Sequence, residues 1–256
     1  MTEVLRTEGI VKRFGSVLAL DGVSMHLEEG EILGILGDNG AGKSTLIKIL
    51  TGYETPTAGR LFVRGAQVAL RSVDHARSLG IECVYQDLAL VNGLSVYHNM
   101  FLNREQRRRF PPFMLDNAAM RRQAERVLIG IGVNIPSVNL EVERLSGGQR
   151  QAIAVARSVY TDAKILLLDE PLAAMGAKEA AMILDLVRDL KERGDVSVII
   201  IAHNYGQVLE VCDRVNLLQH GEITLDKYAR DTSVQELTNL VVAEYREALK
   251  QRHRTA

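Results

Sequence analysis

One eight-residue stretch of the sequence has the glycine spacing of a phosphate-binding loop. The stretch reads GDNGAGKS and contains Gly37, Asp38, Asn39, Gly40, Ala41, Gly42, Lys43 and Ser44, with Thr45 directly after it. In this pattern backbone N–H groups curl around phosphate oxygens, the lysine reaches the β- and γ-phosphates, and the hydroxyl binds Mg²⁺. A glycine-rich turn that merely precedes a helix is the alternative, but the complete match favours a nucleotide site.

Two adjacent carboxylates end an apolar run further along the chain. The run ILLLDE begins at Ile165 and ends in Asp169 and Glu170. Asp169 could hold the hydration shell of Mg²⁺, and Glu170 could orient and deprotonate an attacking water molecule as a general base. A strand that ends in Asp-Glu can also simply cap the next helix. The phosphate-binding loop upstream favours the catalytic role.

A serine and two glycines stand directly before a helical pattern, in the run LSGGQRQ. Ser146 could cap the helix, and Gly147, Gly148 and Gln149 would leave its N-terminal N–H groups open to a second anion. Read alone, the run is simply a capped helix. It lies about a hundred residues after the phosphate loop and about twenty before ILLLDE.

Four apolar runs must position these residues. They read EILGILG, IECVYQ, ILLLDE and VSVIIIAH, and each ends on a polar residue or on glycine. Such runs, alternating with amphipathic stretches, predict a parallel sheet covered by helices on both faces. Helical spacing between Lys178 and Arg193 predicts a crossover helix between two strands. Ligands bind beyond the carboxyl ends of such strands, so we expect the chemistry to collect there.

The remaining segments predict additional layers around this sheet. The first thirty residues and Gly59 to Val68 indicate short strands with turns, forming a small antiparallel layer. Residues from about Leu88 to Ser158 indicate helices and loops, interrupted at Pro111-Pro112. Ser233 and Glu236 fit a capping box that opens a further helix. Its apolar side would comprise Val234, Leu237, Val241 and Tyr245.

The overall composition excludes several classes of protein. Thirty-one basic and 32 acidic residues give a formal charge of −1, which argues against a dedicated nucleic-acid binder. Two cysteines without metal or redox spacing indicate buried thiols. We find no signal peptide, and the apolar runs are shorter than the ~20 residues that cross a bilayer, so any membrane role is expected at its cytoplasmic face. The densest basic cluster, Arg107 to Arg109, is interpreted as a solvated loop rather than a phosphate-contacting site, with a basic loop near a membrane as the alternative, and no function is assigned to it.

The three motifs, in this order, resemble those of ATP-binding-cassette (ABC) proteins, and the resemblance extends along the whole chain. It implies binding of ATP with Mg²⁺, the metal being held by Ser44, Gln86 and Asp169. Gln86 matches the Q-loop glutamine, which also couples the site to a membrane partner. His203 matches the switch histidine, which contacts the γ-phosphate and helps to orient the base. Phe14 matches an aromatic that stacks on adenine, although a core phenylalanine is the alternative.

The resemblance is strongest to the ATPases of sugar importers. GDNGAGKST, GIECVYQDLAL, LSVYHNMFLNRE and HNYGQVLEVCDRV are similar to segments of ribose, xylose, galactose and fructose importers. Leu172 and Gly176 depart from the commonest family pattern, which has threonine and aspartate there. Loss of that acidic residue would weaken communication between the two sites of a dimer. With one cassette in the chain, we expect two copies to associate and Ser146 to complete the ATP site of the other copy.

The resemblance implies an α/β P-loop NTPase (RecA-like) core sheet with an N-terminal antiparallel β layer and an inserted α-helical subdomain. Within one ABC ATP-binding domain (1–256), we expect the core at about 1–88 and 158–225, the helical subdomain at about 89–157, and a C-terminal helical tail at about 226–256.

The function that the resemblance implies is hydrolysis of ATP to power an importer of a simple sugar such as fructose, ribose or xylose. The expected partners are permease subunits and, through them, a periplasmic or extracellular sugar-binding protein, with the chain peripheral on the cytoplasmic face of the inner membrane. A soluble ATPase acting on ribosomes or DNA would need tandem cassettes, coiled coils or basic extensions. A regulatory module without turnover would have lost Glu170, His203 or Ser146.

Overall fold

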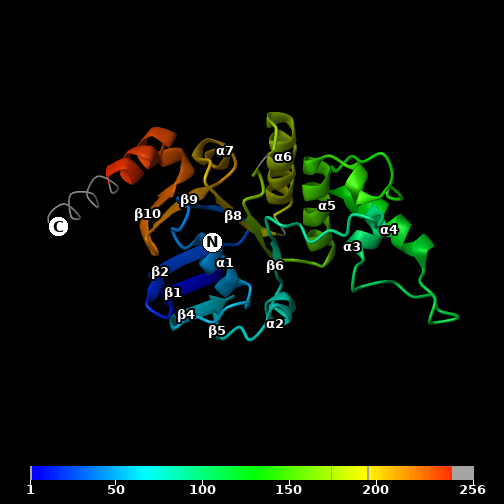
Figure 1. Cartoon of the computed structure of the whole chain (residues 1–256), viewed down its shortest axis with the longest axis horizontal. Coiled ribbons are helices and arrows are strands. Elements are labelled where there is room, and N and C mark those ends of the chain that lie inside the picture. Colours follow the sequence, from blue (N-terminus) through cyan, green and yellow to red (C-terminus); the bar gives the residue numbers. More distant parts are fainter. Residues whose placement is uncertain (1, 174, 195, 244–256) are drawn as a thin grey trace.

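A six-stranded sheet forms the centre of the molecule (Figure 1). The computed structural model describes residues 2–173, 175–194 and 196–243. The strand order is β10-β9-β3-β8-β7-β6, in which all neighbours pair in parallel except β10 and β9. The strands are β3 (Ile32–Leu36), β6 (Ile81–Val84), β7 (Ile165–Asp169), β8 (Ser197–Ala202), β9 (Arg214–Gln219) and β10 (Glu222–Tyr228). The parallel sheet predicted from the four apolar runs is therefore confirmed.

The central strands form because their residues are mostly branched and apolar and are covered on both faces. Every residue of β3 and β8 is buried. Runs of this kind are typical of parallel strands between two layers of helices. In the strand register, Leu36 lies opposite Ala202, and Asp169 lies opposite Ile201. The carboxyl ends of β3, β7 and β8 therefore meet at one edge of the sheet.

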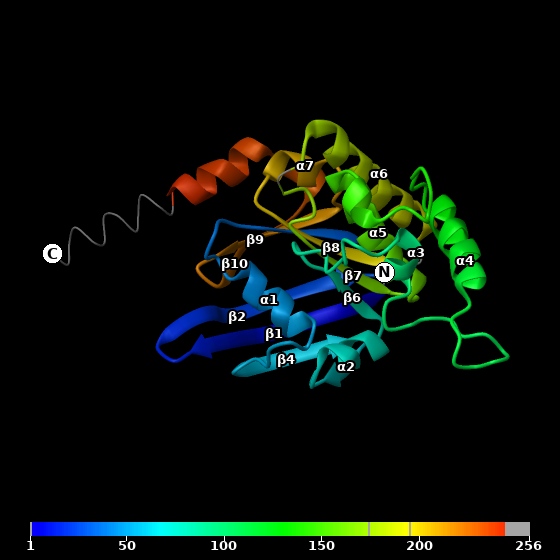
Figure 2. The same cartoon turned by 45° about the vertical axis from the view of Figure 1, so that its right-hand side comes forward.

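Helices cover both faces of the sheet (Figures 1 and 2). Helix α1 (Lys43–Leu50) lies between the six-stranded sheet and a second sheet, where Leu46 joins a buried cluster with Leu33 of β3. On the opposite face, α5 (Gly147–Tyr160) and α6 (Ala177–Arg193) pack against each other and bury a second apolar cluster. The crossover helix predicted between β7 and β8 is α6.

The second sheet is the predicted antiparallel layer, with the strand order β2-β1-β4-β5. Its strands are β1 (Glu3–Phe14), β2 (Val17–Glu28), β4 (Ala58–Val63) and β5 (Ala66–Val68). The expectation of short strands was wrong for β1 and β2, which have 12 residues each. Gly9 and Gly22, with φ of 58° and 75°, lie in these strands where the pairing register shifts. They form irregularities within long strands rather than turns between short ones.

The segment between β6 and β7 contains helices and loops, as expected. Its helices are α3 (Val96–Met100), α4 (Asn117–Gly130), α5 and the 3₁₀ turn η1 (Val142–Arg144). Figure 2 shows α3, α4 and α5 together on one side of the molecule, with a long loop between α3 and α4 that extends outward. The boundaries of a separate helical subdomain remain a prediction.

The chain continues beyond β10 into a further helix. The 3₁₀ turn η2 (Ala229–Asp231) follows β10 and leads into the helix at 234–243. Two short helices lie earlier in the chain: α2 (Val73–Ser78) between β5 and β6, and α7 (Tyr205–Leu209) between β8 and β9. The Ser233 hydroxyl accepts a hydrogen bond from the Glu236 N–H, as predicted, whereas the Glu236 carboxylate accepts from Lys227 and Thr232. Tyr245 lies outside the described residues. No helix among the described residues is both long and apolar enough to span a membrane.

Candidate functional site

The predicted phosphate loop joins the end of β3 to the start of α1. Gly37 and Gly42 have φ of 157° and 110°. A Cβ atom on Gly37 would lie 2.3 Å from the Leu218 carbonyl oxygen, and one on Gly42 would lie 2.7 Å from the Ala19 carbonyl oxygen. Only glycine fits at these two positions, because the backbone conformation and the neighbouring backbone both exclude a side chain.

The other residues of the loop divide into a tip and a helix start. Asp38, Asn39 and Gly40 form its exposed tip, while Ala41 is buried beneath it. Ser44 and Thr45 stand in the first turn of α1, where Ser44 is exposed. The free N–H groups and the positive end of the α1 dipole lie at this same point, which suits an anion.

Lys43 is buried inside the loop that precedes it. The residue is 6% exposed, and its Nζ donates hydrogen bonds to the carbonyl oxygens of Gly37 at 2.7 Å and Asp38 at 2.9 Å. Burial lowers the pKa of its ammonium group, while the charges of Glu170, Asp38 and Asp169 act in the opposite direction. A buried cation therefore stands close to the predicted Mg²⁺ ligand and the predicted base.

Asp169 and Glu170 lie where β7 ends. Burial and then the neighbouring Glu170 carboxylate raise the pKa of Asp169, against an opposing effect of Lys43. Glu170 has a φ of 48°, and its N–H donates to the Ile201 carbonyl oxygen at 2.9 Å. Few residues other than glycine adopt this left-handed conformation, and such residues cluster at functional sites. The turn places the two carboxylates in different surroundings.

His203 follows β8 and lies beside Glu170. Its Nδ1 atom is 3.4 Å from the Glu170 Oε2 atom. The two residues lie together because Asp169 pairs with Ile201, so that β7 and β8 finish at the same sheet edge. Both residues line a hollow of about 210 Å³. The structure thus brings together two predicted site residues that are 33 positions apart in the sequence.

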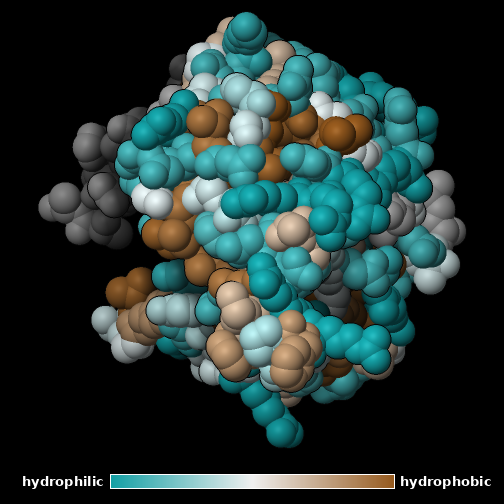
Figure 3. Space-filling view, turned by 90° about the vertical axis from the view of Figure 1, so that its right-hand side faces the viewer, coloured by the Kyte–Doolittle hydropathy of each residue, from teal (hydrophilic) through white to brown (hydrophobic). Residues whose placement is uncertain are grey.

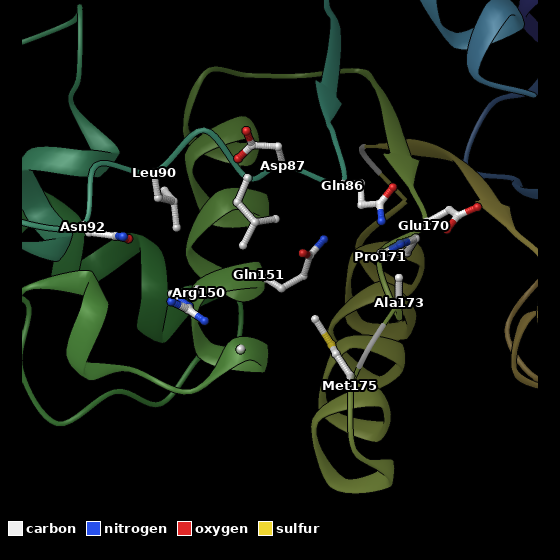
Figure 4. A pocket seen from close by; sticks show the side chains of 12 residues that line it. Gln86, Asp87, Leu90, Asn92, Arg150, Gln151, Glu170, Pro171, Ala173 and Met175 are labelled. Carbon is white, nitrogen blue, oxygen red and sulfur yellow. The ribbon is translucent and has the colours of Figure 1, made fainter.

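Gln86 follows β6 and lines a larger cavity, of about 410 Å³ (Figure 4). Glu170 lines the same cavity, and so does Gly147 in the first turn of α5. Figure 4 shows the Gln151 side chain pointing from α5 toward Gln86. The cavity therefore lies between the strand ends and the start of α5, and it brings together residues from three predicted motifs.

Gln151 was not among the predicted site residues, although it ends the LSGGQRQ run. It is 3% exposed, and its Nε2 atom has no hydrogen-bond partner within the described part of the chain. Buried amides without a protein partner are uncommon. The signal that could have identified it is its spacing, because it lies four residues after Gly147 and hence on the same face of α5.

Ser146 begins α5 as its N-cap. Its hydroxyl accepts a hydrogen bond from the Gln149 N–H at 3.3 Å, and the Gln149 Oε1 atom accepts one from the Ser146 N–H at 3.1 Å. Gly148 lies so close to α6 that a Cβ atom there would be 2.8 Å from Glu179 Cβ, whereas Gly147 faces open space. Among residues 2–173, 175–194 and 196–243, no hydrogen bond or ion pair joins Ser146 or Gln149 to the phosphate loop.

Phe14 lies at the end of β1 and is 45% exposed, so the core alternative for this residue was wrong. The Lys12 Nζ atom lies 4.8 Å from the centre of its ring. The same Nζ donates to Glu54 at 2.7 Å and to the Thr55 carbonyl oxygen at 2.8 Å. One side of the aromatic ring is thus held by a fixed cation, while the ring remains accessible to solvent.

Comparison with known proteins gives matches over nearly the whole chain. The family model described as ABC transporter matches residues 20–173. The xylose/arabinose import ATP-binding protein XylG of Sulfolobus acidocaldarius is 46% identical over 243 residues, covering 95% of each chain. The fructose import ATP-binding protein FrcA of Rhizobium meliloti is 45% identical over 225 residues, covering 85% of each chain.

A solved structure agrees with these sequence matches. The crystal structure of the ADP conformation of MJ1267, an ATP-binding cassette of an ABC transporter, superposes with a TM-score of 0.78 at 26% identity. The superposition covers 93% of this chain and 94% of that chain. The predicted α/β fold and the predicted family are thus confirmed. The chain belongs to the ABC transporter family, as one of its ATP-binding, ATP-hydrolysing subunits.

Proposed function

We propose that this chain hydrolyses Mg²⁺-bound ATP on its phosphate loop and so powers the import of a simple sugar through a membrane permease. The observation that carries the proposal is the meeting of Lys43, Glu170 and His203 at the sheet edge where the phosphate loop opens. The sugar is inferred from the relatives, which are named for the import of xylose or arabinose and of fructose.

The phosphate loop and Phe14 are proposed to bind the nucleotide. Backbone N–H groups from Gly37 to Thr45 would surround the phosphate oxygens, and Lys43 would exchange its carbonyl partners for the β- and γ-phosphates. Phe14 would stack on adenine, which its exposed ring at the end of β1 allows.

Ser44, Gln86 and Asp169 are proposed to hold the Mg²⁺ ion. They offer hydroxyl, amide and carboxylate oxygens, which are the hard ligands that Mg²⁺ prefers, with phosphate oxygens and water completing the shell. The raised pKa of Asp169 fits this role, because a bound cation would offset both its burial and the repulsion from Glu170. Zinc is not expected, because zinc sites in proteins use mainly cysteine and histidine.

Glu170 is proposed as the general base and His203 as its positioning partner. Glu170 would accept a proton from water as the water oxygen bonds to the γ-phosphorus and the bond to the β–γ bridging oxygen breaks, which yields ADP and phosphate. His203, 3.4 Å from Glu170, would orient this carboxylate and contact the γ-phosphate. Lys43 would stabilise the negative charge of the transferred group.

Two copies of the chain are proposed to form the working unit. Ser146, Gly147, Gly148 and Gln149 of one copy would then contact the ATP bound to the other, since the exposed start of α5 has no bond to its own phosphate loop in the described residues.

The remaining proposed partners are permease subunits and, through them, a periplasmic or extracellular sugar-binding protein. The proposed location is peripheral, on the cytoplasmic face of the inner membrane. The division into core (1–88 and 158–225), helical subdomain (89–157) and tail (226–256) belongs to the same proposal.

Hydrolysis can be tested with the purified chain and the Lys43→Ala variant. We expect phosphate release from ATP to require Mg²⁺, to stop on chelation, and to resume when Mg²⁺ alone is returned. Lys43→Ala should remove the activity, because the loop loses its charge-assisted contact to the triphosphate. Normal turnover by this variant, or a requirement for zinc, would contradict the proposed site.

The substrate requires a separate experiment in cells. Uptake of labelled xylose, arabinose, fructose and ribose should be compared between a strain that carries the wild-type chain and one that carries Lys43→Ala. We expect uptake of at least one of these sugars to depend on the wild-type chain. Equal uptake of all four sugars in the two strains would leave the ATPase assignment intact and contradict sugar import.

A further inference from the structure

A protruding hairpin between α3 and α4 carries the densest basic cluster of the chain. We call residues 106–116 the basic hairpin. Its two arms are joined by a β-bridge between Arg107 and Leu115, and by hydrogen bonds from the Arg108 N–H to the Met114 carbonyl at 2.8 Å and from the Asp116 N–H to the Gln106 carbonyl at 2.7 Å. Figures 1 and 2 show this segment extending beyond the helices that flank it.

The tip of the basic hairpin is apolar and exposed. Phe110 is 87% exposed and Phe113 is 80% exposed, and Met114 and Leu115 are exposed beside them. Single exposed apolar side chains are normal on a protein surface, but a group of large ones on one projection indicates a contact surface. Figure 3 looks onto this side of the molecule and shows apolar atoms in its lower half, bordered by hydrophilic ones.

The same projection is strongly cationic. Arg107, Arg108 and Arg109 are exposed, and within the described part of the chain no carboxylate lies within 4.0 Å of their guanidinium groups. No acidic residue occurs between Glu105 and Asp116. A chain with a net charge of −1 thus presents three arginines beside an apolar tip, none of them ion-paired within the residues that the structure describes.

The base of the hairpin is fixed to the body of the protein. Asp116 caps α4 by accepting a hydrogen bond from the Ala119 N–H at 2.9 Å. On the other arm, the Gln106 side chain donates to the Tyr160 hydroxyl of α5 at 3.4 Å. The preceding Arg104 is bonded to Glu82 at 3.1 Å. The hairpin is therefore held in place at its base while its tip has few contacts.

We propose that the basic hairpin docks on the surface of a lipid bilayer that contains anionic phospholipids. The aromatic tip would enter the boundary between head groups and acyl chains, while the arginines pair with phosphates above it. A single-stranded nucleic acid is disfavoured because its binding sites are grooves that follow the backbone. A protein pocket would have to desolvate three arginines and supply a carboxylate for each, whereas a lipid surface offers phosphates at every lateral position.

Docking of the basic hairpin on lipid involves neither the ATP site nor the sugar, and so goes beyond the proposed function. It uses only the family's association with membranes. Contact with lipid would hold the cassette at the bilayer surface without the permease, and it would be weak and reversible, since one short projection supplies the whole attraction.

Binding can be measured by sedimentation of the full chain with vesicles. We expect binding to vesicles of phosphatidylcholine mixed with phosphatidylglycerol, weak binding to phosphatidylcholine alone, and loss of binding at high salt. Substitution of Arg107, Arg108 and Arg109 by glutamine should weaken binding roughly a hundredfold, at roughly fivefold per arginine. The control replaces the exposed Arg71, Arg122 and Arg126 by glutamine, which gives the same net charge. Equal losses in the two variants would contradict docking by the hairpin.

Insertion of the tip can be followed by fluorescence, because the chain contains no tryptophan. Phe110→Trp should show a blue shift on anionic vesicles and quenching by brominated acyl chains. Ile129→Trp, at an exposed position on α4, should show neither. A shift that occurs only when the permease is present in neutral lipid would overturn the lipid assignment in favour of a protein contact. The hairpin variants should retain full ATPase activity in solution, so that failure here is distinct from failure of the proposed function.

Discussion

Asp169 and Glu170 are adjacent in the sequence, yet the backbone turn at the end of β7 gives them different neighbours. Asp169 ends the strand, where burial and the charge of Glu170 raise its pKa. Glu170 turns away in the left-handed conformation and lies beside His203. A divalent cation would relieve the unfavourable charge of Asp169, whereas Glu170 remains available for water. The backbone turn therefore separates the proposed metal ligand from the proposed base.

The role of Glu170 predicts a variant that binds ATP without hydrolysing it. Glu170→Gln keeps the size and polarity of the side chain but cannot accept a proton from water. We expect the turnover rate to fall about 10²- to 10⁴-fold, while ATP binding to the phosphate loop is retained. The measurement is phosphate release together with the amount of labelled ATP that remains bound. Full hydrolysis by this variant would remove Glu170 from the mechanism.

The raised pKa of Asp169 predicts that the nucleotide-free protein is less stable than it could be. The charged form of a group with a raised pKa is disfavoured in the folded state. Its penalty is therefore present above that pKa and disappears as the pH falls through it. We expect Asp169→Asn to unfold at a higher urea concentration than the wild type at neutral pH without nucleotide. This difference should shrink in acid, below the pKa of the aspartate.

A function for Asp169 predicts the opposite effect once Mg²⁺ and ATP are present. The wild type should then gain stability by binding its ligand, and Asp169→Asn should gain less. Its hydrolysis should also fall. A variant that is destabilised without nucleotide, or that gains as much stability from Mg²⁺ and ATP as the wild type, would contradict this account.

The strands that could be predicted are those whose residues are uniformly apolar. The continuous apolar runs of β3, β7 and β8 predict buried parallel strands, because both faces of a parallel strand must be buried. β9 was not predicted, since it contains Arg214, Asn216 and Gln219 and yet is buried throughout. β10 alternates exposed and half-buried residues at the sheet edge and gives only a weak signal. Polar residues in these two strands are stabilised by bonding partners elsewhere in the chain, which the local sequence pattern does not show.

The grouping of some candidate site residues follows from the parallel sheet. Motif residues at strand ends must lie together once the strands are parallel, which accounts for Glu170 beside His203. Gln151 could not be assigned to the site from its own type, because a glutamine in an amphipathic helix usually faces solvent. Its burial follows from the way α5 packs toward the strand ends. Only its spacing from Gly147, which puts both residues on one face of α5, can be read from the sequence, whereas the packing of that face depends on tertiary contacts.

Arg214 shows how one polar residue of β9 joins two other strands and the connection before β3. Its guanidinium group bonds to Glu31 before β3 at 2.8 Å, to both carboxylate oxygens of Asp226 in β10 at 2.8 and 2.9 Å, and to the His26 carbonyl oxygen of β2 at 2.6 Å. The arginine thus ties the two sheets together. Its removal would leave the buried Glu31 carboxylate without its cation.

We therefore expect Arg214→Ala to lower the free energy of unfolding by about 3–5 kcal/mol. Arg214→Lys should recover only part of this loss, because an ammonium group cannot reproduce the planar contacts to three partners. Arg188→Ala provides the control, since the ion pairs of Arg188 within the described residues, with Asp185 and Glu210, are exposed and its loss should change stability by less than about 1 kcal/mol. Urea unfolding measures all three variants, and equal effects at positions 214 and 188 would contradict the assignment.

Ser146 is proposed to serve the ATP site of the other copy rather than that of its own chain. Its hydroxyl and the Gln149 side chain are bonded to each other at the exposed start of α5. If two chains pack about a two-fold axis, each chain contributes the same residues to the other. Two identical composite sites then form. Ser146 would then act on the ATP held by Lys43 of the other copy.

Mixed dimers distinguish shared sites from sites made within one chain. All chains carry Glu170→Gln so that bound ATP is trapped, and trapping is compared with dimers that carry this change alone. In the first mixture, one chain carries Lys43→Ala and the other carries Ser146→Arg. Shared sites place both lesions in one site and leave the other intact, so trapping should reach about half. Sites within one chain would each carry a lesion, and no ATP would be trapped.

In the second mixture the expected results for shared sites and for sites within one chain are exchanged, which provides a control for cooperativity between the two sites. Both lesions are placed in one chain, Lys43→Ala together with Ser146→Arg, and the other chain carries only Glu170→Gln. Shared sites would then each contain one lesion, so that trapping should be lost, whereas sites within one chain would leave the second chain intact and trap about half. Loss of trapping in both mixtures would indicate that one damaged site disables its partner. Half-trapping in the second mixture but not in the first would show that Ser146 acts on its own chain's ATP, against the role proposed for LSGGQ.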